Sequence, residues 1–164
     1  MPTRGVLYVH SSPSAVCPHV EWAVSRVLGV PVRMEWTAQP AEVPVGLRAQ
    51  TQWSGRAGTA GMLATALRQW PMLRFEVTEE PSPGVDGERI AYTPSQGVFR
   101  SATSANGDIV VSEDRLRSVM TTASGPDALD HGLRRLLGMA WDEELEPYRQ
   151  GGDGAPVTVL HQAI

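Results

Sequence analysis

The residues best suited to chemistry follow the first apolar run of the chain. His10 ends that run, the hydroxyls of Ser11, Ser12 and Ser14 come next, and His19 stands near the start of a helical pattern. An imidazole at such a position can serve as a general base. Serine hydroxyls and the N–H groups of a helix start can hold a carboxylate or phosphate. The structural alternative is that the serines form turn and cap hydrogen bonds, with His10 as the satisfied polar end of a strand.

Three arginines are candidate ligands for an anion. Arg33, Arg48 and Arg74 each alternate with apolar residues, a period of two that places them on the polar face of a sheet. Such a face can bind a ligand, a second subunit or the C-terminal half of the same chain. Cross-strand pairs of these arginines with glutamates are equally well explained as a solvated surface.

The remaining chemistry-bearing residues do not assemble into a metal or cofactor site. Cys17 is the single cysteine and lies two positions from His19, so the two side chains point in different directions on a helix and a buried, inert thiol is expected. The carboxylates of residues 142–144 are consecutive and cannot converge on one ion. Four histidines include no helical pair at i, i+4. We expect no metal and no cofactor.

Apolar periodicity in the first half predicts six elements that would position these residues. Strands are expected at residues 6–10, 30–36, 47–53 and 73–78, and helices at 16–28 and 59–70. This order is the split β-α-β, or ferredoxin-like βαββαβ, arrangement. The sequence therefore predicts an α+β fold with a ferredoxin-like half over residues 1–80. The strands should form one layer that is apolar beneath two helices and polar on the reverse.

The second half, residues 81–164, predicts a β-meander followed by helices that pack on the first half. Strands are expected at residues 89–93, 98–103 and 108–111, and helices begin at Ser112 and Pro126. The acids of residues 142–146 suit the start of another short helix. Residues 157–160 are a candidate strand, although the sequence leaves open whether it joins the main sheet. We expect one domain over residues 1–164.

Composition narrows the classes of partner. The formal net charge is −4, and all 14 basic residues are arginine. A net negative charge and the lack of an aromatic stacking platform argue against nucleic-acid binding. No apolar run approaches the roughly 18–20 residues that cross a bilayer. We therefore expect a cytoplasmic protein with no nucleic-acid or membrane partner.

Four long strings of the chain resemble an actinobacterial family, a domain of unknown function. They are the TRGVLYVHS opening, the CPHVEW entry to the first helix, LRFEVTEEPSPG and AWDEELEPYR. The resemblance covers almost the whole chain. It implies no established activity and no catalytic residues, and it implies a genomic context of fatty-acid synthesis.

These observations leave two hypotheses of different classes. The first is a non-catalytic regulatory or protein-interaction module that binds a protein partner, a second copy of itself or a small anionic metabolite, with a link to fatty-acid metabolism. The alternative is a small enzyme with a pocket at the end of the first strand. In that enzyme His10 would be the general base, Ser11 or Ser14 would orient the substrate, and Arg33 or Arg74 would hold a carboxylate.

Overall fold

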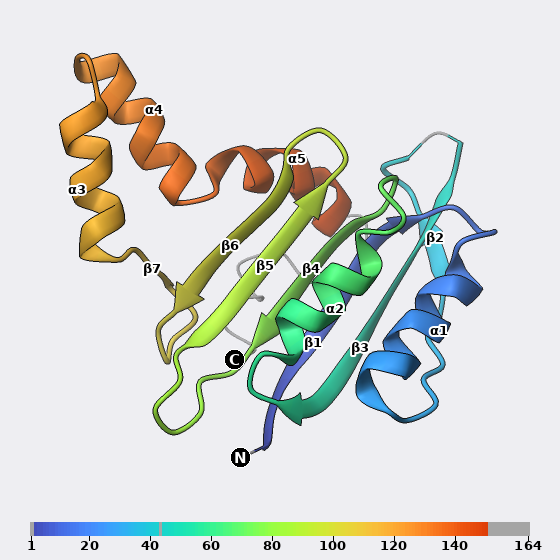
Figure 1. Ribbon diagram of the computed structural model, residues 1–164. Helices are drawn as coiled ribbons and strands as arrows, with labels where there is room; N and C mark the ends of the chain where they lie inside the picture. Colours follow the sequence, from blue (N-terminus) through green and yellow to red (C-terminus); the bar gives the residue numbers. More distant parts are fainter. Residues whose placement is uncertain (1, 43, 151–164) are drawn as a thin grey trace.

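A computed structural model describes residues 2–42 and 44–150. Within them the chain forms a mixed α+β fold around one antiparallel sheet (Figure 1). The strands are β1 (Pro2–Ser12), β2 (Thr37–Gln39), β3 (Gly46–Arg56), β4 (Arg74–Glu79), β5 (Gly87–Thr93), β6 (Gly97–Thr103) and β7 (Ile109–Val110). The helices are α1 (Cys17–Leu28), α2 (Thr59–Leu67), α3 (Glu113–Thr122), α4 (Pro126–Leu136) and α5 (Met139–Gln150).

The sheet joins both halves of the chain. Its strand order is β2-β3-β1-β4-β5-β6-β7, and every neighbouring pair is antiparallel. Helices α1 and α2 lie side by side on one face, and α5 crosses the other face at one end (Figure 1). The expected α+β class and the predicted meander after the fourth strand are confirmed.

Alternation along the central strands creates two different faces. Leu7 and Val9 on β1 and Phe75 and Val77 on β4 point toward α1 and α2, and all four are at most 1% exposed. Each fully buried side chain of this kind stabilises the fold by roughly 1.5–3 kcal/mol. The residues between them, including Glu76, face the opposite side. The main core therefore lies between the sheet and its two covering helices.

The predicted strand at residues 30–36 is wrong, because the paired strand is the three-residue β2 that follows it. Side chains of α1 bind the backbone donors that a strand would use. Ser25 Oγ accepts from the Val32 N–H at 2.8 Å, and Glu21 Oε1 accepts from the Met34 N–H at 2.9 Å. Pro31 has no N–H to offer a neighbour. This extended segment thus packs along α1 instead of joining the sheet.

The residue that precedes helix α2 is a glycine, and a side chain from another strand caps the helix. Gly58 adopts a left-handed φ of 92°, which side chains tolerate poorly. Glu79, at the end of β4, accepts hydrogen bonds from the N–H groups of Gly58 at 2.8 Å and Ala60 at 2.9 Å. A carboxylate from another strand thus caps this helix, which suits the positive end of the helix dipole.

The last three helices pack in two different ways. Trp141 and Leu145 of α5 pack against Ala91 of β5 and Phe99 of β6 and form a second core on the reverse face. Helices α3 and α4 form a hairpin, here called the arm, that extends away from the sheet (Figure 1). No residue of α3 is buried. Among the described residues, α5 is thus the helix of the C-terminal half that covers the reverse face.

No helix within residues 2–42 and 44–150 combines the length and apolar character needed to cross a bilayer. The candidate strand at residues 157–160 lies outside the described residues.

Candidate functional site

The candidate base His10 lies on the reverse face of the sheet and is 2% exposed. Its Nε2 is 2.7 Å from Oε2 of Glu76 on the neighbouring strand β4. A carboxylate can only accept, so Nε2 carries the hydrogen of this bond. The His10 ring also stacks on Tyr8, with 6.0 Å between ring centroids. The imidazole is thus held on one side by a ring and on its Nε2 by a carboxylate.

Two arginines complete the environment of Glu76. Arg89 of β5 donates from Nη2 to Oε1 at 2.7 Å, and Arg149 of α5 donates from Nε to Oε2 at 2.9 Å. Asp142 of α5 accepts from Nη2 of Arg89 at 2.6 Å and of Arg149 at 2.9 Å. Two carboxylates and two guanidinium groups therefore balance each other beneath α5. We call His10, Glu76, Arg89, Asp142 and Arg149 the buried network.

Contacts within the buried network shift the pKa values of Glu76 and Arg149. Burial by itself would raise the pKa of Glu76. The hydrogen bonds from His10 and Arg149 and the charge of Arg89 outweigh it, so the pKa lies well below its ordinary value. Burial likewise opposes the charge of Arg149, yet the hydrogen bond to Glu76 and the carboxylate charges raise its pKa. Each charged form is thus stabilised by its partners, which is typical of a structural ion cluster.

A second polar cluster lies around Glu42, in the segment between β2 and β3. Ser11 Oγ donates to Oε2 of Glu42, and Arg74 Nη1 donates to its Oε1 at 3.4 Å. The Arg74 guanidinium also stacks over the ring of Tyr148 at 4.5 Å and lies 3.7 Å from Glu144. The structure therefore brings Ser11 and Arg74 together, with two acids already beside the arginine.

The other predicted site residues lie apart from these clusters. Ser12 is buried, and its hydroxyl donates to the carbonyl of Pro13 at 3.0 Å. Ser14 and His19 are exposed, and the His19 ring is 6.0 Å from that of Trp70. Exposed Arg33 pairs with Glu21 at 3.4 Å beside α1. Within the described part of the chain, Nη1 of the half-buried Arg48 is enclosed without a hydrogen-bond partner.

Cys17 is a buried thiol at the start of α1, 5% exposed. Burial raises its pKa, which keeps the sulfur protonated and lowers its reactivity. Among residues 2–42 and 44–150, no group of three His, Cys, Asp or Glu side chains is arranged to hold a metal ion.

Sequence reasoning missed three members of the buried network: Arg89, Asp142 and Arg149. Glu76 and Arg149 are separated by 73 positions, so no local pattern joins them. One signal was present in the acidic stretch of α5. Asp142, Leu145 and Arg149 follow the i, i+3, i+7 spacing of one helix face, which indicates a helix buried on that side.

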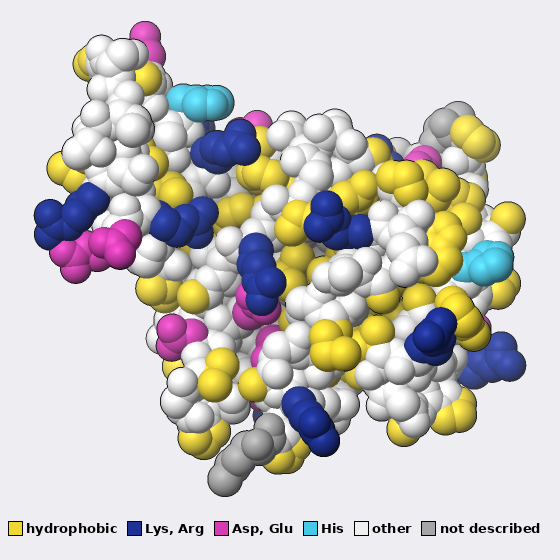
Figure 2. All heavy atoms as spheres, in the orientation of Figure 1, with side chains coloured by type: hydrophobic (Ala, Val, Ile, Leu, Met, Phe, Trp, Pro, Cys, Tyr) yellow, Lys and Arg dark blue, Asp and Glu magenta, His cyan; other side chains and the backbone are white. Residues whose placement is uncertain are grey.

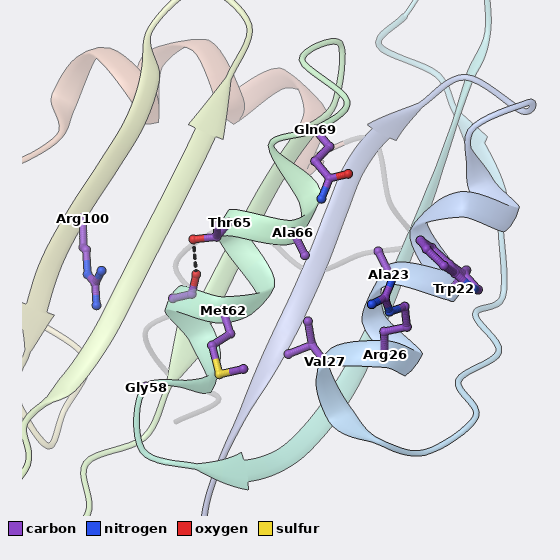
Figure 3. A pocket seen from close by; sticks show the side chains of 11 residues that line it. Trp22, Ala23, Arg26, Val27, Gly58, Met62, Thr65, Ala66, Gln69 and Arg100 are labelled. Carbon is purple, nitrogen blue, oxygen red and sulfur yellow. Dashed lines mark hydrogen bonds between the residues drawn. The ribbon is translucent and has the colours of Figure 1, made fainter.

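A different feature lies on the opposite face of the sheet. A shallow groove of about 670 Å³ crosses α2, with α1 on one side and Arg100 of β6 on the other (Figure 3). Trp22 of α1 and Met62 of α2 line it and are 56% and 58% exposed. Hydrophobic side chains are spread over this face in the region of α1 and α2, with arginine side chains among them (Figure 2). The groove therefore combines exposed apolar surface with positive charge.

The arm and the residue that follows it carry three more large exposed apolar side chains. Leu116 and Met120 of α3 are 40% and 64% exposed, and Leu137, which follows α4, is 43% exposed. The two surfaces differ in shape, since the groove is concave whereas the arm projects into solvent.

Comparisons with known proteins place the chain in a family. Searches of curated proteins and of solved structures gave no match. A family model described as "Protein of unknown function (DUF3145)" matches residues 6–162. That range includes all strands and helices of the fold, apart from the first residues of β1. The chain therefore belongs to the DUF3145 family of proteins of unknown function.

Proposed function

We propose that the protein is a non-catalytic interaction module and that the groove across α2 is where it binds a protein partner. The observation that carries this proposal is the pair of exposed side chains Trp22 and Met62 in a concave surface. Tryptophan is enriched among residues that dominate binding energies. Methionine adapts its shape to a partner. Exposed side chains of this size, gathered in one hollow, favour a binding surface over solvated exterior.

The buried network favours this role over the small enzyme. His10 is 2% exposed and already bonded to Glu76, and the groove across α2 is lined by other residues. A general base must reach the proton that it removes. The pairing of His10 with a carboxylate resembles a general base and its orienting group. Glu76 is also bonded to Arg89 and Arg149, so we interpret the pair as part of the attachment of α5 to the sheet.

The first half of the fold supports the finer ferredoxin-like assignment that we propose for Pro2–Glu79. Strand β3 lies between β1 and β2, and β1 lies between β3 and β4. Each helix therefore connects two strands that are separated by one other strand, which is the split β-α-β arrangement. This fold serves enzymes and binding modules alike, so it is compatible with the proposed role without selecting it.

A small anionic metabolite is a second ligand class in this proposal, on the reverse face. Arg48 supports it, because its Nη1 is enclosed and lacks a hydrogen-bond partner among the described residues. An unpaired guanidinium nitrogen is costly unless an anion or water satisfies it. A regulatory role would follow if such a ligand changed partner binding. The link to fatty-acid metabolism stays a proposal that rests on the family resemblance.

Affinity capture with the full chain tests the interaction role. Wild type, a groove variant (Trp22→Ala with Met62→Ala) and an arm variant (Leu116→Ala with Met120→Ala) are immobilised and exposed to extract of the source organism. Bound proteins are quantified by mass spectrometry. We expect a specific set of proteins that the wild type and the arm variant retain and the groove variant loses. Equal capture by all three chains would refute the groove as the binding surface.

A further inference from the structure

The groove across α2 has a charge pattern that is unusual for this chain. Among the described residues, its lining includes two arginines, Arg26 and Arg100, and no aspartate or glutamate. Helix α2, which forms its floor, has no charged residue among its nine. The chain as a whole has 18 acidic and 14 basic residues, a net charge of −4. The charge of the lining is therefore opposite in sign to that of the whole molecule, with Glu88, outside the lining, paired to Arg100.

Both arginines are held in place at the edges of the groove. The Arg26 guanidinium lies 4.8 Å from the centre of the Trp22 ring, so these two residues of α1 form one stacked unit. Arg100 donates from Nε to Glu88, and its Nη atoms lie close to Gly61 of α2. A partner that binds such pre-positioned groups loses less side-chain entropy.

The positions of these side chains indicate which kind of partner the groove can bind. Met62 offers an apolar centre. Arg100 stands on one side of α2, and Arg26 stacked on Trp22 stands on the other side (Figure 3). A floor of nine helical residues is about 14 Å long, the length of two to three turns of a docked helix. We infer that the groove binds an acidic amphipathic helix, whose apolar side contacts Trp22 and Met62 while carboxylates on its flanks pair with Arg26 and Arg100.

This inference rests on the proposed interaction role and names the partner of the same groove. Opposite charges across the interface would mainly increase the association rate and select the partner. The apolar centre would supply most of the binding free energy. The groove is open and shallow, and that shape favours a polypeptide segment over a small enclosed ligand.

Selection from a displayed library of helix-forming peptides of about 16 residues tests the inference with the full-length chain as bait. We expect the enriched peptides to place apolar residues at i, i+3 and i+4 and Asp or Glu on the flanks. Their affinity should fall about tenfold or more with Trp22→Ala or Arg26→Glu. Arg115→Glu on α3, which changes the net charge by the same amount, should leave it within about twofold. When the Arg26→Glu chain is the bait, the selection should enrich peptides with lysine at one flank.

Several outcomes would overturn the inference. These are enrichment of neutral or basic peptides, peptides that bind the Trp22→Ala chain equally well, and a library that yields no binder. Self-association in sedimentation equilibrium that disappears with Trp22→Ala would assign the groove to a second copy of the chain instead. If the peptides fail while capture from extract still depends on Trp22 and Met62, the interaction role stands and only the acidic helix is wrong.

Discussion

Glu76 holds a charge in the middle of the sheet, where water does not reach it. Its two oxygens accept hydrogen bonds from His10, Arg89 and Arg149, which come from two strands and a helix. Taking such a carboxylate out of water is costly, and only the paired charges offset the penalty. Removing Glu76 therefore affects more than one bond, since it leaves two buried arginines with Asp142 as their nearest acid.

Replacement of Glu76 by glutamine should be strongly destabilising. We expect Glu76→Gln to lower the free energy of unfolding by about 3–5 kcal/mol, because it removes the charge but keeps the shape. Urea unfolding measures this change. The control is Glu113→Gln, which removes an exposed i, i+4 pair with Arg117 and should cost less than about 0.5 kcal/mol. A loss for Glu76→Gln as small as that of the control would show that the network contributes little.

The same residue gives the fold a defined acid sensitivity. The pKa of Glu76 in the folded protein lies below its ordinary value of 4.5. Its stabilising contribution is therefore complete above that value and declines as the pH falls through the lower, folded pKa. We expect the free energy of unfolding of the wild type to fall more steeply below about pH 4.5 than that of Glu76→Gln. Parallel pH profiles for the two proteins would contradict this assignment.

At the scale of elements, the arm depends on a close contact between its two helices. A Cβ added at Gly132 of α4 would lie 2.6 Å from Cγ1 of Val119 on α3. Glycine normally costs about 1 kcal/mol relative to alanine inside a helix. At this position the missing side chain lets the helices approach.

We expect Gly132→Ala to loosen the arm in the wild-type background and to strengthen it when combined with Val119→Ala. Valine is restricted at χ1 and cannot easily turn away, so the clash outweighs the gain in helix propensity. Hydrogen exchange of the α3 and α4 amides measures the effect. Slower exchange for Gly132→Ala alone would mean that the helices separate without cost.

How far sequence predicts these elements depends on where their hydrogen bonds go. Strands β1, β3 and β4 were foreseen because their alternation reports real burial of Leu7, Trp53 and Phe75. Residues 30–36 alternate just as clearly, with Met34 buried, yet they form no strand. Glu21 and Ser25 of α1 bind the backbone of that segment and keep it out of the sheet. This is a tertiary contact, which local alternation does not reveal. The surroundings of His10 could not be predicted for a similar reason, since Arg89 and Arg149 reach its partner Glu76 from distant parts of the chain.

For the whole molecule, the two faces of one sheet have separate cores. Leu63 of α2 belongs to the main core and Leu145 of α5 to the second one, and both are fully buried. The strands between them are shared, and Glu76 joins the sheet to α5 through Arg149. Loss of either core should therefore weaken the other, so that the described fold unfolds as one unit.

We expect Leu145→Ala and Leu63→Ala each to lower the free energy of unfolding by about 2–5 kcal/mol. Tryptophan fluorescence and far-ultraviolet circular dichroism should report the same urea midpoint within each variant, because α5 and the sheet lose structure together. Leu137→Ala is the control, since this side chain is 43% exposed and its truncation should change little. Two separate unfolding transitions in Leu145→Ala would show that α5 detaches while the sheet persists. The buried network would then hold α5 on the sheet without belonging to the cooperative core.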